Sequence, residues 1–131
     1  MIFVDTNVPM YLIGAPHPNK IETQRLLEQC LLNHRKLVTD AEVFQEILHR
    51  YVAINRREFL QPAFDALQNV IDEIFDIDIH VVDRAKTILL GKLQISSRDA
   101  IHLAVMEANQ IKTIMTFDIG FDDIPGIERL R

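Results

Sequence analysis

The stretch MIFVDTNV (residues 1–8) begins with a short apolar run that stops at a carboxylate. Residues 1–5 are typical of a short buried strand, and the polar residues Thr6 and Asn7 follow it directly. An aspartate that ends a strand is often a helix cap or a turn residue. In an open α/β sheet, however, the carboxyl ends of the strands are also where ligands bind. The rest of the chain decides between these two roles for Asp5.

The composition predicts one globular domain that spans residues 1–131, with 48% hydrophobic residues to form its core. No apolar stretch approaches the roughly 18–20 residues of a membrane-spanning helix. The N-terminus also lacks the basic segment of a secretion signal, so we expect a cytoplasmic protein without membrane association. The single cysteine, Cys30, is expected to be a small core residue and not a nucleophile.

The net charge is −5, from 19 acidic and 14 basic residues. This balance argues against a protein that coats nucleic acid with a positive surface. It does not exclude an enzyme that meets phosphates through bound metal, because divalent cations offset clustered carboxylates. An acidic solvated surface accounts for most of the excess in either case.

The apolar pattern predicts short strands that alternate with helices along the whole chain. Strands are expected at residues 1–5, 36–39, 74–82 and 112–118, with a last one at 127–131. Helices are expected at residues 7–13, 19–34, 41–53, 57–74, 81–91 and 98–110. This order indicates an α/β fold, a single domain with a central, mostly parallel sheet of short strands flanked by helices.

Four carboxylates are candidates for a common site at one edge of that sheet. Asp5 and Asp118 follow strands, whereas Glu46 and Asp99 lie on helices that can face the strand ends. Each has a purely structural alternative, such as a turn residue, a solvated flank or, for Asp99, a favourable place at a helix N-terminus. Two divalent cations held by such acids can activate water against a phosphodiester, and Mg²⁺ and Mn²⁺ prefer oxygen ligands. Convergent carboxylates would therefore suffice for a nuclease.

Four segments match a known family in order along the chain. They are VDTNV (4–8), TDAEVFQEI (39–47), SSRDAIHLAV (96–105) and TFDIGFDDIPGIERL (116–130). On these segments the chain resembles a PIN-domain ribonuclease, and more closely the VapC-type toxin of a type II toxin–antitoxin pair. The length suits a lone PIN domain with no appended module.

The resemblance implies a metal-dependent endoribonuclease toxin that cleaves single-stranded or looped RNA with metal-activated water. The implied catalytic and metal-binding residues are Asp5, Glu46, Asp99 and Asp118, with Mg²⁺ as the cofactor and Mn²⁺ as a second candidate. The implied residues that orient these groups or contact the substrate are Thr6, Asn7, Arg98 and Thr116, with Asp122 as the alternative fourth acid. The implied partners are RNA, a cognate antitoxin protein and a second copy of the chain in a homodimer.

Other polar residues have open roles at this stage. Glu42 lies one helical turn before Glu46 and is a candidate for an outer position in the site. His102 lies three residues after Asp99. It is either a hydrogen-bonded structural residue or a metal ligand or proton shuttle. The basic residues Arg50, Arg56 and Arg57 form either a solvated helix end or a contact for an RNA backbone or an acidic partner.

Two other functions compete with the nuclease. The pairs Glu46/His49 and Asp99/His102 have the spacing found in carboxylate-bridged di-iron bundles, which would make the chain a redox protein. That fold needs four long helices, and the strands expected at several places in this chain argue against it. The second alternative is a non-catalytic PIN module that acts as a binding or scaffold protein, and the presence of all four acids argues against it.

Overall fold

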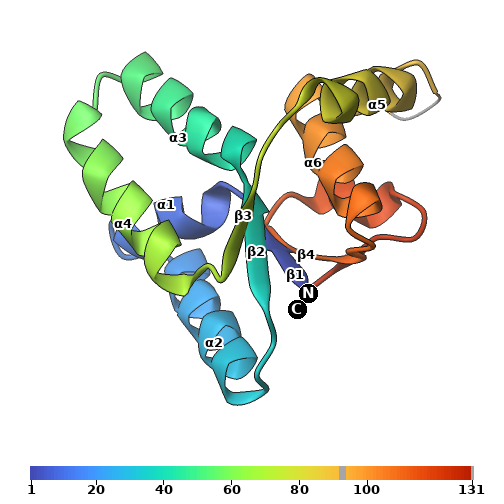
Figure 1. Cartoon of the computed structure of the whole chain (residues 1–131). Helices are drawn as coiled ribbons and strands as arrows, with labels where there is room; N and C mark the ends of the chain where they lie inside the picture. Colours follow the sequence, from blue (N-terminus) through green and yellow to red (C-terminus); the bar gives the residue numbers. More distant parts are fainter. Residues whose placement is uncertain (92–93, 131) are drawn as a thin grey trace.

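A single five-stranded sheet forms the centre of the molecule (Figure 1). The computed structural model describes residues 1–91 and 94–130. The strands are β1 (Ile2–Val4), β2 (Leu37–Asp40), β3 (Glu73–Phe75), β4 (Thr113–Met115) and β5 (Glu128–Arg129). They lie in the order β3-β2-β1-β4-β5, and every neighbouring pair is parallel. The predicted α/β fold with a parallel sheet is therefore confirmed.

Helices cover both faces of this sheet. They are α1 (Asn7–Ile13), α2 (Pro18–Leu32), α3 (Ala41–Ala53), α4 (Leu60–Val70), α5 (Ile79–Leu89) and α6 (Ser97–Ala108), with short 3₁₀ helices at Arg57–Phe59 and Ile119–Asp123. Figure 1 shows α1 to α4 on one side of the sheet and α5 and α6 on the other. None of the helices in the described part of the chain is long and apolar enough to span a membrane.

The central strand β1 is fully buried, as the opening apolar run predicts. Its neighbours β2 and β4 contribute buried side chains to the same core, and Cys30 of α2 packs there as expected. On the other face, α5 and α6 approach closely because Ala85, Ala100 and Ala104 form their contact. This packing fixes the start of α6, where Asp99 lies, against the body of the molecule.

The strand order creates a switch point beside β1. From β1 the chain builds β2 and β3 on one side, then crosses to build β4 and β5 on the other. In open parallel sheets, the crevice at the carboxyl ends of the strands flanking such a switch is the usual ligand site. Asp5 lies there, and its N–H donates to the carbonyl of Met115 at 3.1 Å. The fold therefore brings the ends of β1 and β4 together.

Two sequence-based boundaries are wrong. The helix expected at 57–74 is a 3₁₀ turn followed by α4, with Pro62 in its first turn, and it ends at Val70. Asp72 then binds both backbone groups of Leu37, which turns the chain into β3. The strand expected at 74–82 ends at Phe75, because the side chain of Asp78 accepts the N–H of Val81 and caps α5. Alternation of apolar and polar residues mimicked a strand across this cap.

The end of α6 carries a backbone strain that a substitution can relieve. Gln110 follows this helix with φ of 57°, in the left-handed region that costs L-residues about 1–2 kcal/mol. We expect Gln110→Gly to raise the free energy of unfolding by about 0.5–1 kcal/mol, after the larger entropy of the unfolded glycine chain is subtracted. Urea unfolding measures the change. Gln110→Ala keeps the Cβ atom and is the matched control, and equal stability of the two variants would contradict the explanation.

Candidate functional site

Asp5 is held rigidly at the end of β1. One carboxylate oxygen accepts the N–H of Thr6 at 2.7 Å, and the other accepts the hydroxyl of Thr116 at 2.7 Å. The side chain is buried, and burial raises its pKa despite the nearby His102, while Glu46 raises it further. Burial and Glu46 therefore disfavour the charged form of this carboxylate, and a bound cation would favour it.

Thr116 connects Asp5 to the loop after β4. Its hydroxyl oxygen accepts the side-chain amide of Asn7 at 3.1 Å and the N–H of Asp118 at 3.1 Å. The N–H of Phe117 in turn donates to the side-chain oxygen of Asn7. Three of the four residues predicted to orient the site or contact the substrate therefore lie around Asp5: Thr6 through its backbone, and Asn7 and Thr116 through their side chains.

Asp118 and Asp122 have different surroundings. Asp118 is exposed and accepts the N–H of Gly120 at 2.9 Å, which forms the start of the 3₁₀ helix Ile119–Asp123. Asp122 instead forms a two-pronged ion pair with Arg129, which also donates to the carbonyl of Thr116. Asp118 interacts electrostatically with Asp99, and Asp122 links the loop to Arg129 of β5.

Asp99 lies in the first turn of α6, which Ser96 caps by accepting the Asp99 N–H at 3.1 Å. Burial raises the pKa of Asp99 to about 6, and the negative charges of Asp5 and Asp118 contribute to this increase. Asp99 therefore interacts electrostatically with both Asp5 and Asp118. With Glu46, which repels Asp5 from α3, they form a group that we call the acidic site.

Arg98 lies beside the acidic site. Its guanidinium nitrogens lie 3.8 Å from Glu46 Oε1 and 3.9 Å from Glu42 Oε1. Both glutamates are on the same face of α3, as the spacing predicts, and both are partly buried. Arg98 therefore links α6 to α3 beside the acidic site.

His102 is a hydrogen-bonded residue buried beneath Asp5, which is one of its expected roles, and its partner Asp40 is the feature that sequence reasoning missed. His102 Nδ1 donates to Asp40 Oδ2 at 2.8 Å, and its Nε2 lies 3.9 Å from Asp5 Oδ1 without a hydrogen-bond partner in the described part of the chain. Burial opposes the charged imidazolium, but Asp40, Asp5 and Asp99 outweigh it and raise the pKa of His102 to about 9. Asp40 also caps α3, because its other carboxylate oxygen accepts the N–H of Val43 at 3.0 Å.

Comparison with known proteins places this geometry in a family. Residues 2–127 match the family model described as PIN domain. The chain belongs to the PIN-domain family. It is 56% identical to Ribonuclease VapC13 of Mycobacterium tuberculosis over 130 residues, which cover 99% of each chain. It is 37% identical to Ribonuclease VapC23 of the same species over 118 residues, 90% of this chain and 93% of that one. The resemblance to VapC-type PIN toxins found in the sequence is therefore confirmed.

A solved structure shares the same PIN fold. The structure of VapBC2 from Rickettsia felis, bound to a DNA fragment from its promoter, superposes with a TM-score of 0.75 over 99% of this chain and 98% of that chain. Its sequence identity is 21%, so this likeness concerns the fold alone. A bundle of four long helices, which the di-iron alternative requires, is incompatible with this five-stranded sheet.

The acidic site of this PIN domain offers the oxygen ligands that a hard divalent cation prefers. All four side chains offer carboxylate oxygens, the ligands that Mg²⁺ and Mn²⁺ prefer. Among the described residues, no group of three or more His, Cys, Asp or Glu side chains is placed to hold a metal ion, so there is no cage made of protein ligands alone. Mg²⁺ usually keeps several waters and binds through one or two carboxylates, so a closed cage is not required. The mutual repulsion of Asp5 and Asp99 is the observation that fits a bound cation.

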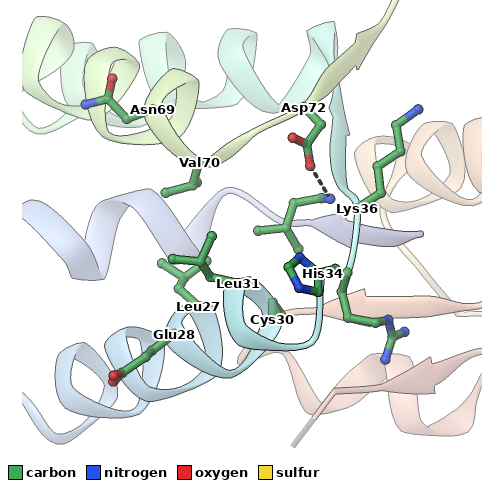
Figure 2. A pocket seen from close by; sticks show the side chains of 11 residues that line it. Leu27, Glu28, Cys30, Leu31, His34, Lys36, Asn69, Val70 and Asp72 are labelled. Atoms are coloured by element: carbon green, nitrogen blue, oxygen red, sulfur yellow. Dashed lines mark hydrogen bonds between the residues drawn. The ribbon is translucent and has the colours of Figure 1, made fainter.

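A cavity of about 710 Å³ lies beside the start of β2, at the amino ends of the strands. Figure 2 shows apolar side chains of α2 and α4, among them Leu27, Leu31 and Val70, around this hollow. Asp72, also in its wall, accepts the N–H of Leu37 at 2.9 Å. That carboxylate stabilises the turn into β3. None of the four acids of the acidic site lines this cavity, so the two sites are separate.

Proposed function

We propose that the chain is a metal-dependent endoribonuclease and the toxin of a VapBC-like toxin–antitoxin pair. The observation that carries this proposal is that Thr116 joins Asp5, at the end of β1, to Asp118, after β4, at the switch point of the sheet. Glu46 and Asp99 each interact electrostatically with Asp5. The relatives named ribonucleases, which align over nearly the whole chain, support the same activity. We also propose that residues 1–131 form one functional domain.

The four acids are the proposed ligands of Mg²⁺, and Mn²⁺ fits the same oxygen donors. A bound divalent cation would activate water and offset the charge that develops on the phosphate. The chain's own residues keep the ligands in place: Thr6 and Thr116 fix both oxygens of Asp5, and Asn7 fixes Thr116. Arg98 is positioned to meet a substrate phosphate if its ion pairs with Glu42 and Glu46 open.

The proposed partners follow from the same assignment. A toxic ribonuclease requires an inhibitor, and we propose a cognate antitoxin protein in this role, as well as RNA as the substrate. We also propose a homodimer, because α2 and α3 expose apolar side chains that a partner surface would cover. These are Ile21, Leu31 and Leu32 on α2 and Leu48 and Val52 on α3.

Purified protein tests the nuclease directly. We expect it to cleave single-stranded RNA when Mg²⁺ or Mn²⁺ is present and to stop when a chelator is added, as followed on denaturing gels. Cleavage that continues in excess chelator would contradict the metal-dependent mechanism. Intact RNA under all metal conditions would favour the alternative, a non-catalytic PIN module.

The identity of the fourth acid is a separate prediction. We expect Asp118→Asn to lower cleavage by about 100-fold or more, because even residues that only hold a metal ligand contribute about 10- to 100-fold. Asp122→Asn removes a partner of Arg129 and not a ligand, so it should change the rate far less. Initial rates at saturating Mg²⁺ compare the two variants. The reverse order of effects would assign the fourth position to Asp122.

A further inference from the structure

A cavity of about 390 Å³ opens next to the acidic site, between α1 and α3. Its volume lies in the range of about 300–1,000 Å³ that is typical of small-molecule sites. The lining side chains that bear on its chemistry are Asn7, Tyr11, His17 and Arg50. None of the described residues that line it is acidic, in a chain whose net charge is −5. The cavity is therefore locally suited to an anionic ligand.

The rings beside this cavity form a continuous row. The Tyr11 ring lies 5.1 Å from the Phe117 ring, at 71°, and 5.1 Å from the His17 ring, at 36°. Tyr11 is partly buried, and its edge-on contact with Phe117 holds it in place, whereas His17 is exposed. A fixed, partly accessible ring of this kind is a platform on which a flat ligand can stack.

The cavity and the acidic site share a wall. Asn7 lines the cavity and also donates to Thr116, whose hydroxyl donates to Asp5. On the other side, Arg50 lies one helical turn after Glu46 on α3, so the two side chains occupy the same face. A phosphodiester chain crossing the acidic site would therefore pass from Glu46 toward Arg50.

We propose that this cavity is a nucleotide subsite that binds an unpaired base of RNA adjacent to the bond that is cut. The base stacks on the Tyr11–His17 row, and Arg50 pairs with a flanking phosphate. Unpaired bases are commonly recognised by stacking on aromatic rings, combined with cationic contacts to the backbone. The inference rests on the proposed function, and it adds which residues would hold a base next to the bond that is cut.

Binding of octauridine RNA tests the subsite independently of cleavage. The starting protein is the full chain with Asp5→Asn, without divalent metal, so that the RNA stays intact, and affinity is measured by fluorescence anisotropy. We expect Tyr11→Leu to weaken binding about tenfold, in line with the 1–3 kcal/mol of one stacked base, while Tyr11→Phe retains it. His17→Asn removes the ring but keeps an oxygen that can cap α2. It should also weaken binding.

Arg50 has a matched control at the opposite edge of the sheet. Arg50→Ala should weaken binding and lower the salt dependence by about one phosphate contact, whereas Arg35→Ala should leave both unchanged. Equal losses in the two variants would mean that general charge attracts the RNA and would overturn the assignment. Circular dichroism and thermal unfolding verify that each variant is folded.

Stacking itself has a direct signature. With 2-aminopurine placed at each position of the octamer in turn, we expect its fluorescence to fall on binding at one or two positions, and to recover in Tyr11→Leu. Unchanged affinity in all ring variants, together with no quenching, would overturn the proposal and leave a peptide of a partner protein as the better occupant. Tyr11-dependent binding by a chain that never cleaves RNA would support the subsite while contradicting the proposed function.

Discussion

In the Asp5→Asn protein, we expect metal-dependent RNA cleavage to fall by about 10³-fold or more, because a bound metal stabilises transition-state charge by several kcal/mol. The substitution preserves the shape of a side chain that is buried between Thr6 and Thr116. It removes the charge that would bind the cation. Initial cleavage rates measure the effect, and near wild-type cleavage would contradict the catalytic assignment of Asp5.

Asp76 provides a matched control for this experiment. It directly follows β3 as Asp5 follows β1, but β3 is at the edge of the sheet and Asp76 is exposed. We expect Asp76→Asn to cleave RNA like the wild type. Thermal unfolding adds a second readout: Mg²⁺ at 100 times its dissociation constant should stabilise the wild type by about 2.7 kcal/mol, and the Asp5→Asn protein much less. Equal metal stabilisation of both proteins would place the cation elsewhere.

For Asp40→Ala, we expect a loss of about 3–5 kcal/mol in the free energy of unfolding, since removal of one partner leaves the other charge of a buried pair uncompensated. Asp40 and His102 are both almost completely buried, 2.8 Å apart, and the cap of α3 is lost as well. Asp40→Asn can keep the cap and should lose less. Urea unfolding compares the three proteins. A loss below 1 kcal/mol in Asp40→Ala would contradict a charged pair.

The same pair predicts how stability depends on pH in the metal-free protein. Burial lowers the pKa of His102, but Asp40, Asp5 and Asp99 outweigh burial and raise it from 6.5 to about 9. The corresponding stabilisation, about 3 kcal/mol, is complete below pH 6.5 and disappears as the pH rises to about 9. The wild type should therefore lose stability across this interval, and the Asp40→Asn protein should lose less. Parallel curves for the two proteins would show that His102 is not the titrating group.

Local patterns predicted most elements because each one depends on nearby residues. The helix at Ala41–Ala53 has its cap at Asp40, and α6 has its cap at Ser96, so both starts could be predicted. The region around Asp78 could not, because its alternating residues fit a strand as well as a capped helix. Only the contact of Asp72 with Leu37 fixes where β3 begins, and that contact joins residues 35 apart.

The acidic site could be predicted as a set of residue types but not as an arrangement. The sequence contains acids at or near several strand ends, and nothing local distinguishes Asp5 from Asp40 or Asp76. The fold assigns them different roles: Asp40 turns toward His102, while Asp76 lies on an exposed edge. These roles depend on tertiary contacts that no single-sequence pattern records.

The position of β1 in the sheet determines when the protein can become active during its synthesis. Thr116, which fixes the carboxylate of Asp5, is synthesised 111 residues after it. Pairing over such a separation forms slowly and late in folding. A nascent chain still being extended on the ribosome therefore has β1 without its partner β4 and lacks Asp118. The proposed RNA cleavage therefore requires that the chain has been synthesised through Asp118 and that β4 has paired with β1.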